Sequence, residues 1–273
     1  LCRSHLTARA GDGLTGELMV AFELDAHLSP KKVFWCLWAI CGLLLVADYA
    51  FTYLDLTGYY VFERTFAMTK EESIPNWYAS ILLFCIALTC ALTFVMQSPR
   101  VEKYQATPWI FFAVFFAFLS MDDGARIHER LGSFFRELAE EGDGMFTSFQ
   151  PLLEATSTYS WQIFVLPVFL LCGFVMVLWG FNNIAVPETH RWVILGGIAI
   201  APALGLDYFE GLVDNDVIAL EGRFLSVYTI EHYQRVIEEF LEMTGFLCIL
   251  RGLWIHLLSL ESEIKLSVRR SEH

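Results

Sequence analysis

The stretch Trp109-Ile-Phe-Phe-Ala-Val-Phe-Phe-Ala-Phe-Leu119 continues directly into Ser-Met-Asp-Asp-Gly-Ala-Arg-Ile-His-Glu-Arg130. The first part is apolar enough to lie in lipid, whereas the second carries two aspartates, two arginines, a histidine and a glutamate. Charged side chains at membrane depth are costly, and by default they indicate a functional site. This junction therefore predicts a transmembrane helix with a polar site at one end.

The whole chain has the composition of a multi-pass helical membrane protein. Of its 273 residues, 56% are hydrophobic and 18% are charged, whereas soluble domains usually have about 45–50% apolar and about 25% charged residues. The apolar runs are continuous, unlike the alternating pattern of a membrane β-barrel. We therefore predict an all-α polytopic membrane bundle. The net charge of −13 and the lack of a basic patch exclude a nucleic-acid-binding protein.

A membrane-spanning helix needs about 20 apolar residues, and six segments meet this requirement. We expect the third to continue as a polar helix toward Glu140 and the sixth to begin as a polar helix near Tyr228. Residues 31–260 are predicted to form one membrane domain, between an N-terminal segment (1–30) and a tail (261–273). The six predicted spans are Val33–Tyr53, Ala79–Gln97, Pro108–His128, Trp161–Asn182, Trp192–Leu212 and Glu238–Leu258.

The distribution of Lys and Arg predicts the orientation of the spans in the membrane. Eight basic residues follow one set of span ends and six follow the other, but Arg126, Arg130 and Arg136 of the second group lie among carboxylates. We therefore predict that both termini are cytoplasmic, in a bacterial inner membrane. The first group is Lys31, Lys32, Arg100, Lys103, Arg191, Lys265, Arg269 and Arg270.

Two features near the N-terminus and along the spans carry smaller predictions. The first methionine is Met19, and residues 1–18 lack the apolar core of a signal peptide. Our hypothesis is that translation starts at Met19. The seven cysteines contain no Cys-x-x-Cys spacing, and six lie in apolar runs. They are predicted to be small core residues rather than disulfide partners or zinc ligands.

Three predicted spans place carboxylates at the same depth, toward the predicted outer side. With a rise of 1.5 Å per residue, Asp122 lies roughly 20 Å along the third span and Asp207 about 22 Å along the fifth. If the third helix is continuous, Asp122, Arg126 and Glu129 share one face and His128 is offset from it. The sixth span enters from the same side with the dense polar stretch Glu231-His-Tyr-Gln-Arg-Val-Ile-Glu-Glu-Phe-Leu-Glu242.

Carboxylates exceed basic residues in these three clusters, nine against three. Buried neighbouring carboxylates must be protonated, paired or bound to a cation. We infer that spans three, five and six surround one acidic pocket that opens to the non-cytoplasmic side. The structural alternative is an ion-pair network in which Arg126 neutralises Asp122 and Glu129, and Arg235 neutralises its own helical neighbours.

A metal ion is the sharpest interpretation of this pocket. Carboxylates hold a hard cation, and two imidazoles shift the preference toward a transition metal, so we predict a divalent iron, manganese or zinc ion. The acidic groups Asp123 and Glu238, which are not assigned to the metal, are the predicted catalytic residues. The predicted metal ligands are Asp122, His128, Glu129, Asp207, Glu210, His232, Glu239 and Glu242.

These residues leave three functions open. The favoured function is cation binding, in a metal-dependent hydrolase or oxidoreductase that acts on a lipid-like substrate. The first alternative is a proton- or cation-coupled transporter, although only Arg251 and His256 are predicted in the inner half of the bundle and no internal repeat is visible. The second alternative is a non-catalytic subunit of a membrane complex, whose polar network docks another membrane subunit.

The motifs Met121-Asp-Asp-x-x-x-x-His-Glu129 and Glu238-Glu-x-x-Glu-Met243 resemble those of a group of uncharacterised bacterial multi-pass membrane proteins. Proteins of that group carry an Asp-Asp/Glu…His-Glu helix and a late Glu-Glu…Glu-Met helix. The resemblance covers these two short segments. It implies a helical membrane fold and no particular activity.

Overall fold

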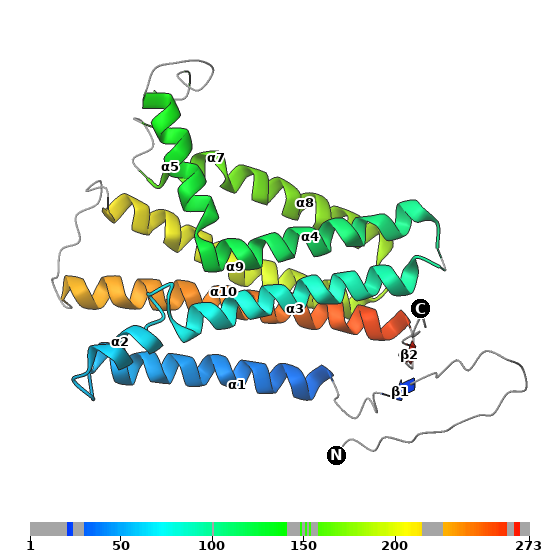
Figure 1. The fold of residues 1–273 in the computed structure, drawn as a ribbon, viewed down its shortest axis with the longest axis horizontal. Helices are drawn as coiled ribbons and strands as arrows, with labels where there is room; N and C mark the ends of the chain where they lie inside the picture. Colours follow the sequence, from blue (N-terminus) through cyan, green and yellow to red (C-terminus); the bar gives the residue numbers. More distant parts are fainter. Residues whose placement is uncertain are drawn as a thin grey trace, which may run out of the picture.

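The chain forms a bundle of six helices that are long and apolar enough to cross a membrane (Figure 1). The predicted all-α polytopic membrane bundle is therefore confirmed, and the protein is an integral membrane protein. The computed structural model describes residues 21–23, 30–99, 101–140, 148, 151, 153, 158–214, 226–260 and 265–267. The hypothesis about residues 1–18 lies outside these ranges.

The six long helices match the six predicted spans, with two differences at their ends. The fourth predicted span is divided at Val165, just before Pro167, and the third ends at Ala125 rather than at His128. The six are α1 (Pro30–Asp48, continued by the π-helix η1, Tyr49–Tyr53), α3 (Ile74–Gln97), α4 (Lys103–Ala125), α8 (Leu166–Asn183), α9 (Pro187–Asp214) and α10 (Val227–Leu260).

Three shorter helices, α2 (Tyr60–Phe66), α5 (Ile127–Glu140) and α7 (Ser160–Phe164), lie at one end of the bundle, which we call the α5 end (Figure 1). Two short strands, β1 (Ala21–Glu23) and β2 (Lys265–Ser267), pair antiparallel at the opposite end. The chain thus crosses the bundle six times and brings segments near its two termini together.

Helix α10 is the centre of the bundle and packs against α9, α3 and α1. Its crossing with α9 is close because both helices have glycine there. A Cβ on Gly245 would lie 3.0 Å from the backbone oxygen of Gly196, and a Cβ on Gly196 would lie 2.9 Å from that of Gly245. Small residues allow such backbone contact between membrane helices. This crossing fixes α9 and α10 side by side, which places their carboxylates together.

Helix α8 lies at the edge of the bundle, with Gly180 as its one buried residue. Aromatic side chains connect it to α4: the ring of Trp179 lies 5.4 Å from that of Trp109, and the ring of Phe169 lies 6.1 Å from that of Phe115. The backbones of α4 and α8 therefore remain apart, and space is left between them.

Candidate cation-binding chamber

The chain turns sharply at Arg126, between α4 and α5. Arg126 has a left-handed backbone conformation (φ 52°, ψ 43°), which is uncommon for a residue other than glycine. Our prediction of one continuous helix toward Glu140 is therefore wrong. As a result, Asp122, Arg126 and Glu129 do not share one helical face.

This turn folds His128 back onto Asp122. The backbone N–H of His128 donates to Oδ1 of Asp122 at 2.6 Å, and Nδ1 lies 2.9 Å from Oδ2. Because a carboxylate accepts, Nδ1 carries a proton, and Nε2 is left for another partner. The ring of His128 also packs edge-to-face on Trp161, at 4.6 Å between centroids. Sequence reasoning had placed His128 away from Asp122, whereas the structure pairs them.

The charges around His128 raise the pKa of its imidazole. Burial acts in the opposite direction, but the hydrogen bond and charge of Asp122, together with Glu129 and Asp207, outweigh it. His128 is thus a histidine whose protonated form is favoured by three neighbouring carboxylates. It is oriented by one of them, in the manner of a general acid or base.

A cavity of about 780 Å³ opens beside this histidine, at the α5 end of the bundle. Its walls come from α5, α9, α10, the α7 region and the segment before α3, and eleven carboxylates and four Lys or Arg residues line it. We call it the acidic chamber. The carboxylates are Glu71, Asp123, Glu129, Glu137, Glu140, Asp207, Glu210, Asp214, Glu238, Glu239 and Glu242.

Three of these carboxylates lie on two successive turns of α10. Glu238, Glu239 and Glu242 line the chamber, and within the described part of the chain no Lys or Arg forms an ion pair with them. One oxygen of Glu238 is buried without a hydrogen-bond partner. Close carboxylates without a cation repel one another. Unless these carboxylates are protonated, this part of the chamber therefore has a deficit of positive charge.

On the α9 wall of the chamber, the negative charge of the carboxylates is compensated by other side chains of the protein. Arg235 of α10 reaches across to α9, where Nη2 lies 3.0 Å from Oε1 of Glu210 and 3.6 Å from Oδ1 of Asp214. Tyr159 donates to the same two carboxylates, at 3.2 and 2.5 Å. Burial and these carboxylates raise the pKa of the Tyr159 hydroxyl. Arg235 thus neutralises α9, and the expectation that it neutralises its own helix is wrong.

Other polar groups hold the remaining chamber residues in place. Asp207 accepts from Nε2 of Gln162 at 2.7 Å, and Asp123 accepts from Oγ of Ser80 at 2.5 Å. Arg126 contacts Glu71 and lies 3.5 Å from Glu129. The ion-pair alternative pairs Arg126 with Asp122 and Glu129; the contact with Glu129 is present, but the left-handed turn directs Arg126 to Glu71 in place of Asp122.

His232 does not belong to the chamber. Its Nε2 lies 3.1 Å from Oδ2 of Asp48, on α1, and the two side chains are 4% and 2% exposed. Oδ1 of Asp48 accepts from the backbone N–H of Met68 at 2.9 Å. The ring of Tyr53 covers His232 at 5.3 Å. The predicted assignment of His232 to the same pocket as Glu239 is therefore wrong, since α1 and η1 cover this part of α10.

Eight of the ten predicted site residues line the acidic chamber: Asp123, His128, Glu129, Asp207, Glu210, Glu238, Glu239 and Glu242. Asp122 lies behind His128, and His232 faces α1. In the ranges that the structure describes, no three His, Cys, Asp or Glu side chains converge as a metal site would require. The predicted ligands that line the chamber are thus distributed along its walls and do not converge on one metal position.

Sequence reasoning missed four residues that shape the chamber. Glu71 comes from the segment before α3, Tyr159 and Trp161 from the start of α7, and Gln162 bridges to α9. The nearest signal is the aromatic Tyr-Ser-Trp sequence at 159–161, of which only Trp161 belongs to a predicted span. A Cβ on Gly132 would lie 2.4 Å from the backbone nitrogen of Trp161. Glycine there lets α5 approach α7 and close the chamber wall.

A second cavity of about 420 Å³ continues from the chamber into the bundle between α4, α8, α9 and α10. We call it the apolar cleft, because aromatic and aliphatic side chains form most of its lining. The chamber and the cleft share five lining residues, namely Asp123, His128, Trp161, Leu204 and Glu242. A polar space and an apolar space therefore meet at His128.

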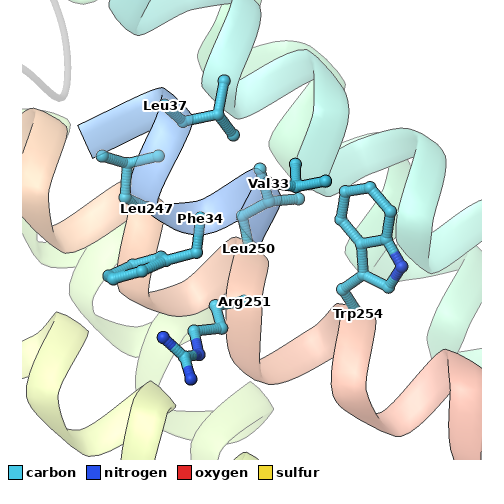
Figure 2. A pocket seen from close by; sticks show the side chains of 7 residues that line it. All are labelled: Val33, Phe34, Leu37, Leu247, Leu250, Arg251 and Trp254. Carbon is cyan, nitrogen blue, oxygen red and sulfur yellow. The ribbon is translucent and has the colours of Figure 1, made fainter. Parts of the chain in front are cut away.

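A small pocket lies beside Arg251, in the opposite half of the bundle (Figure 2). Its volume is about 10 Å³, which is about the space of one water molecule. The guanidinium of Arg251 lies 4.6 Å from the ring centre of Phe34 and 3.9 Å from that of Trp192. Among the described residues Arg251 forms no ion pair, and these cation–π contacts stabilise an arginine at membrane depth.

Residues 35–257 match a protein family described as "Domain of unknown function (DUF8692)". This match covers most of the chain, including four spans completely and all but the terminal residues of the first and the last. The chain belongs to this family. No curated protein and no solved structure matches the chain. The DUF8692 match includes every residue that lines the chamber, from Thr69 to Glu242.

Proposed function

We propose that this DUF8692 protein binds a cation in the acidic chamber. The observation that supports the proposal is the set of three glutamates on α10, Glu238, Glu239 and Glu242, which line a cavity and have no ion-pair partner among the described residues. Elsewhere in the chamber Arg235 and Arg126 neutralise carboxylates. A bound cation would compensate the remaining charge, which otherwise costs free energy.

The cation could serve an enzyme. In this form of the proposal a divalent iron, manganese or zinc ion binds among the chamber carboxylates and His128, and Asp123 or Glu238 acts as a base. Asp122 orients His128 through Nδ1, which leaves Nε2 as the nitrogen that would bind the metal. A lipid-like substrate fits because the apolar cleft begins at His128. We place the chamber on the outer side of a bacterial inner membrane.

Binding has more support than transport. A transporter needs polar residues along a path through the bundle. The chamber instead continues into a cleft with mainly apolar and aromatic lining. The arrangement is thus suited to holding a ligand at the α5 end. A non-catalytic subunit would use the same chamber to dock a partner, and co-purification at fixed stoichiometry would identify that role.

Metal binding to the purified protein tests the proposal directly. Mn²⁺, Fe²⁺, Zn²⁺ and a short alkylamine are titrated separately into protein in neutral lipid nanodiscs, with elemental analysis of the metal-loaded samples. We expect saturable binding of at least one of these cations, weakened about tenfold or more by Glu239→Gln or Glu242→Gln, as for loss of a charged contact. Glu231→Gln is the matched control, since Glu231 lies on α10 outside the chamber. Absence of saturable binding by all four cations would overturn the proposal.

A further inference from the structure

We infer that the ligand of this protein is a cationic amphiphile, whose positively charged headgroup lies in the acidic chamber and whose aliphatic chain lies in the apolar cleft. The inference rests on the proposed function, because the same carboxylates hold the positive charge. It adds the chemical class of the ligand and the place of its chain. A lipid with an amine or quaternary ammonium headgroup has this chemistry.

The first argument is that the two cavities form one amphipathic space. Asp123, His128 and Glu242 line both the chamber and the cleft. On one side of them, eleven carboxylates face four Lys or Arg residues. On the other side, the lining comes from rings such as Phe112, Phe169 and others of α4 and α8. A ligand that fills both spaces must carry a positive end and an apolar end.

The second argument is the length of the cleft. Trp109 and Asp122, both on α4, line it near its two ends. Thirteen residues separate them, which is about 20 Å of helix. Half of a bilayer core is about 15 Å thick. The cleft is therefore long enough for the chain of a lipid from one leaflet, and its volume lies within the usual range of about 300–1,000 Å³ for ligand pockets.

The third argument is access from the membrane. Helix α8 lies at the edge of the bundle, where it touches α4 through rings such as Trp179 and Phe169 rather than through close backbone packing. Leu170, Phe174 and Val177 of α8 line the cleft and are also largely exposed. A lipid chain can thus enter sideways between α4 and α8, without passing through water.

Photo-crosslinking tests the position of the chain. The probe is a long-chain primary amine with a diazirine at the chain terminus, added to the protein in neutral lipid nanodiscs, and mass spectrometry maps the labelled residues. We expect labels near the far end of the cleft, around Gly180 and His190, which both line it. The same chain with a hydroxyl headgroup should label about tenfold less, because it lacks the charged contact.

A variant with a side chain that fills the cleft gives a second test of where the aliphatic chain binds. Gly173 of α8 lines the cleft, and a Cβ there meets no atom within 4 Å. Gly173→Leu should therefore reduce labelling about tenfold or more, the scale on which hydrophobic pockets discriminate by one or two methylenes. Gly42→Leu on α1 is the control, because it also has open space around its Cβ and lines neither cavity.

A chain-length series on the unmodified protein keeps the test independent of folding of the variants. Labelling should rise with chain length until the chain reaches the end of the cleft. Equal labelling by amine and alcohol, labels outside the cleft, or unchanged labelling in folded Gly173→Leu would each overturn the inference. If Mn²⁺, Fe²⁺, Zn²⁺ or the short alkylamine still binds in that case, the proposed function stands; if none of the four binds, both fail.

Discussion

Two aspartate–histidine pairs lie at the α5 end of the bundle, and they differ in what surrounds them. Asp48 and His232 are almost fully enclosed, with side chains 2% and 4% exposed. In the Asp122–His128 pair the aspartate is similarly buried, but His128 is 24% exposed and lines both cavities. The same two residue types thus make a closed contact in one place and a cavity wall in the other.

The difference shows which pair has a structural role. Asp48 accepts the backbone N–H of Met68 and contacts His232, so it connects α1, the segment before α3, and α10. Both carboxylate oxygens of Asp48 therefore have partners within the protein. In the second pair, both carboxylate oxygens of Asp122 accept hydrogen bonds from His128. The Nε2 atom of His128 remains for another molecule. Exposure to a cavity, rather than the residue types, separates a structural pair from a candidate site.

Removal of Asp48 should have the largest effect on stability. Asp48→Ala leaves a buried histidine and a buried backbone N–H without their partner, at a cost of about 3–5 kcal/mol in the free energy of unfolding. Denaturant unfolding in detergent micelles measures it. Glu231→Ala, next to His232 on α10 and partly exposed, is the control. A loss no greater than that of the control would refute a structural role for the closed pair.

Removal of Asp122 should affect binding more than folding. Asp122→Ala leaves the backbone N–H of His128 unpaired and frees the imidazole, for an expected loss of roughly 1–3 kcal/mol in stability. Binding of the cation or amphiphile should weaken about tenfold or more, because His128 is no longer oriented. Titration and unfolding of one preparation compare the two effects. If Asp122→Ala lowered the free energy of unfolding as much as Asp48→Ala and left binding unchanged, both pairs would be structural and the Asp122–His128 pair would have no role in binding.

Neutralisation of the α10 glutamates should stabilise the protein while it removes binding. Glu239→Gln and Glu242→Gln each reduce repulsion in a cavity with excess carboxylates, so the free protein should gain on the order of 1 kcal/mol. Binding residues commonly carry such a cost in stability. Thermal unfolding without added cation measures the gain. Destabilisation by both variants would indicate that these carboxylates already have partners and would contradict a charge deficit.

The sequence predicted the spans well because continuous apolar runs in this chain have one structural solution. Each of the six predicted spans falls on a helix, apart from the ends near His128 and the break at Val165. Six described cysteines are free; Cys41, Cys90 and Cys248 are buried, as expected of small core residues, whereas Cys85 and Cys172 are partly buried and Cys36 is exposed. The carboxylates of the third, fifth and sixth spans lie at one end because helix rise fixes depth.

Depth does not fix rotation or local breaks, and the errors follow from that. His232 and Glu239 lie on similar faces of α10, but α1 covers the first and the chamber borders the second. The left-handed turn falls on Arg126, although Gly124 two residues earlier would be the better candidate by local preference. Because that turn pairs His128 with Asp122, the main feature of the candidate site was not predictable from spacing.

The smallest expected effect is a pH dependence of stability. It arises from the imidazole of His128, the most exposed member of the two pairs. Burial opposes the charged imidazole, but Asp122, Glu129 and Asp207 raise its pKa above the ordinary value. A raised pKa in the folded state contributes stability that is fully present below the unfolded pKa of about 6.5 and is lost as pH rises through the folded pKa. The thermal midpoint of the parent relative to His128→Gln should therefore be highest at mildly acidic pH and decline toward alkaline pH.

Glu231→Gln should keep the parent profile. An advantage of the parent that grew as pH rose would mean that the neutral imidazole is the favoured form, and that the chamber carboxylates do not act on His128 as its geometry indicates.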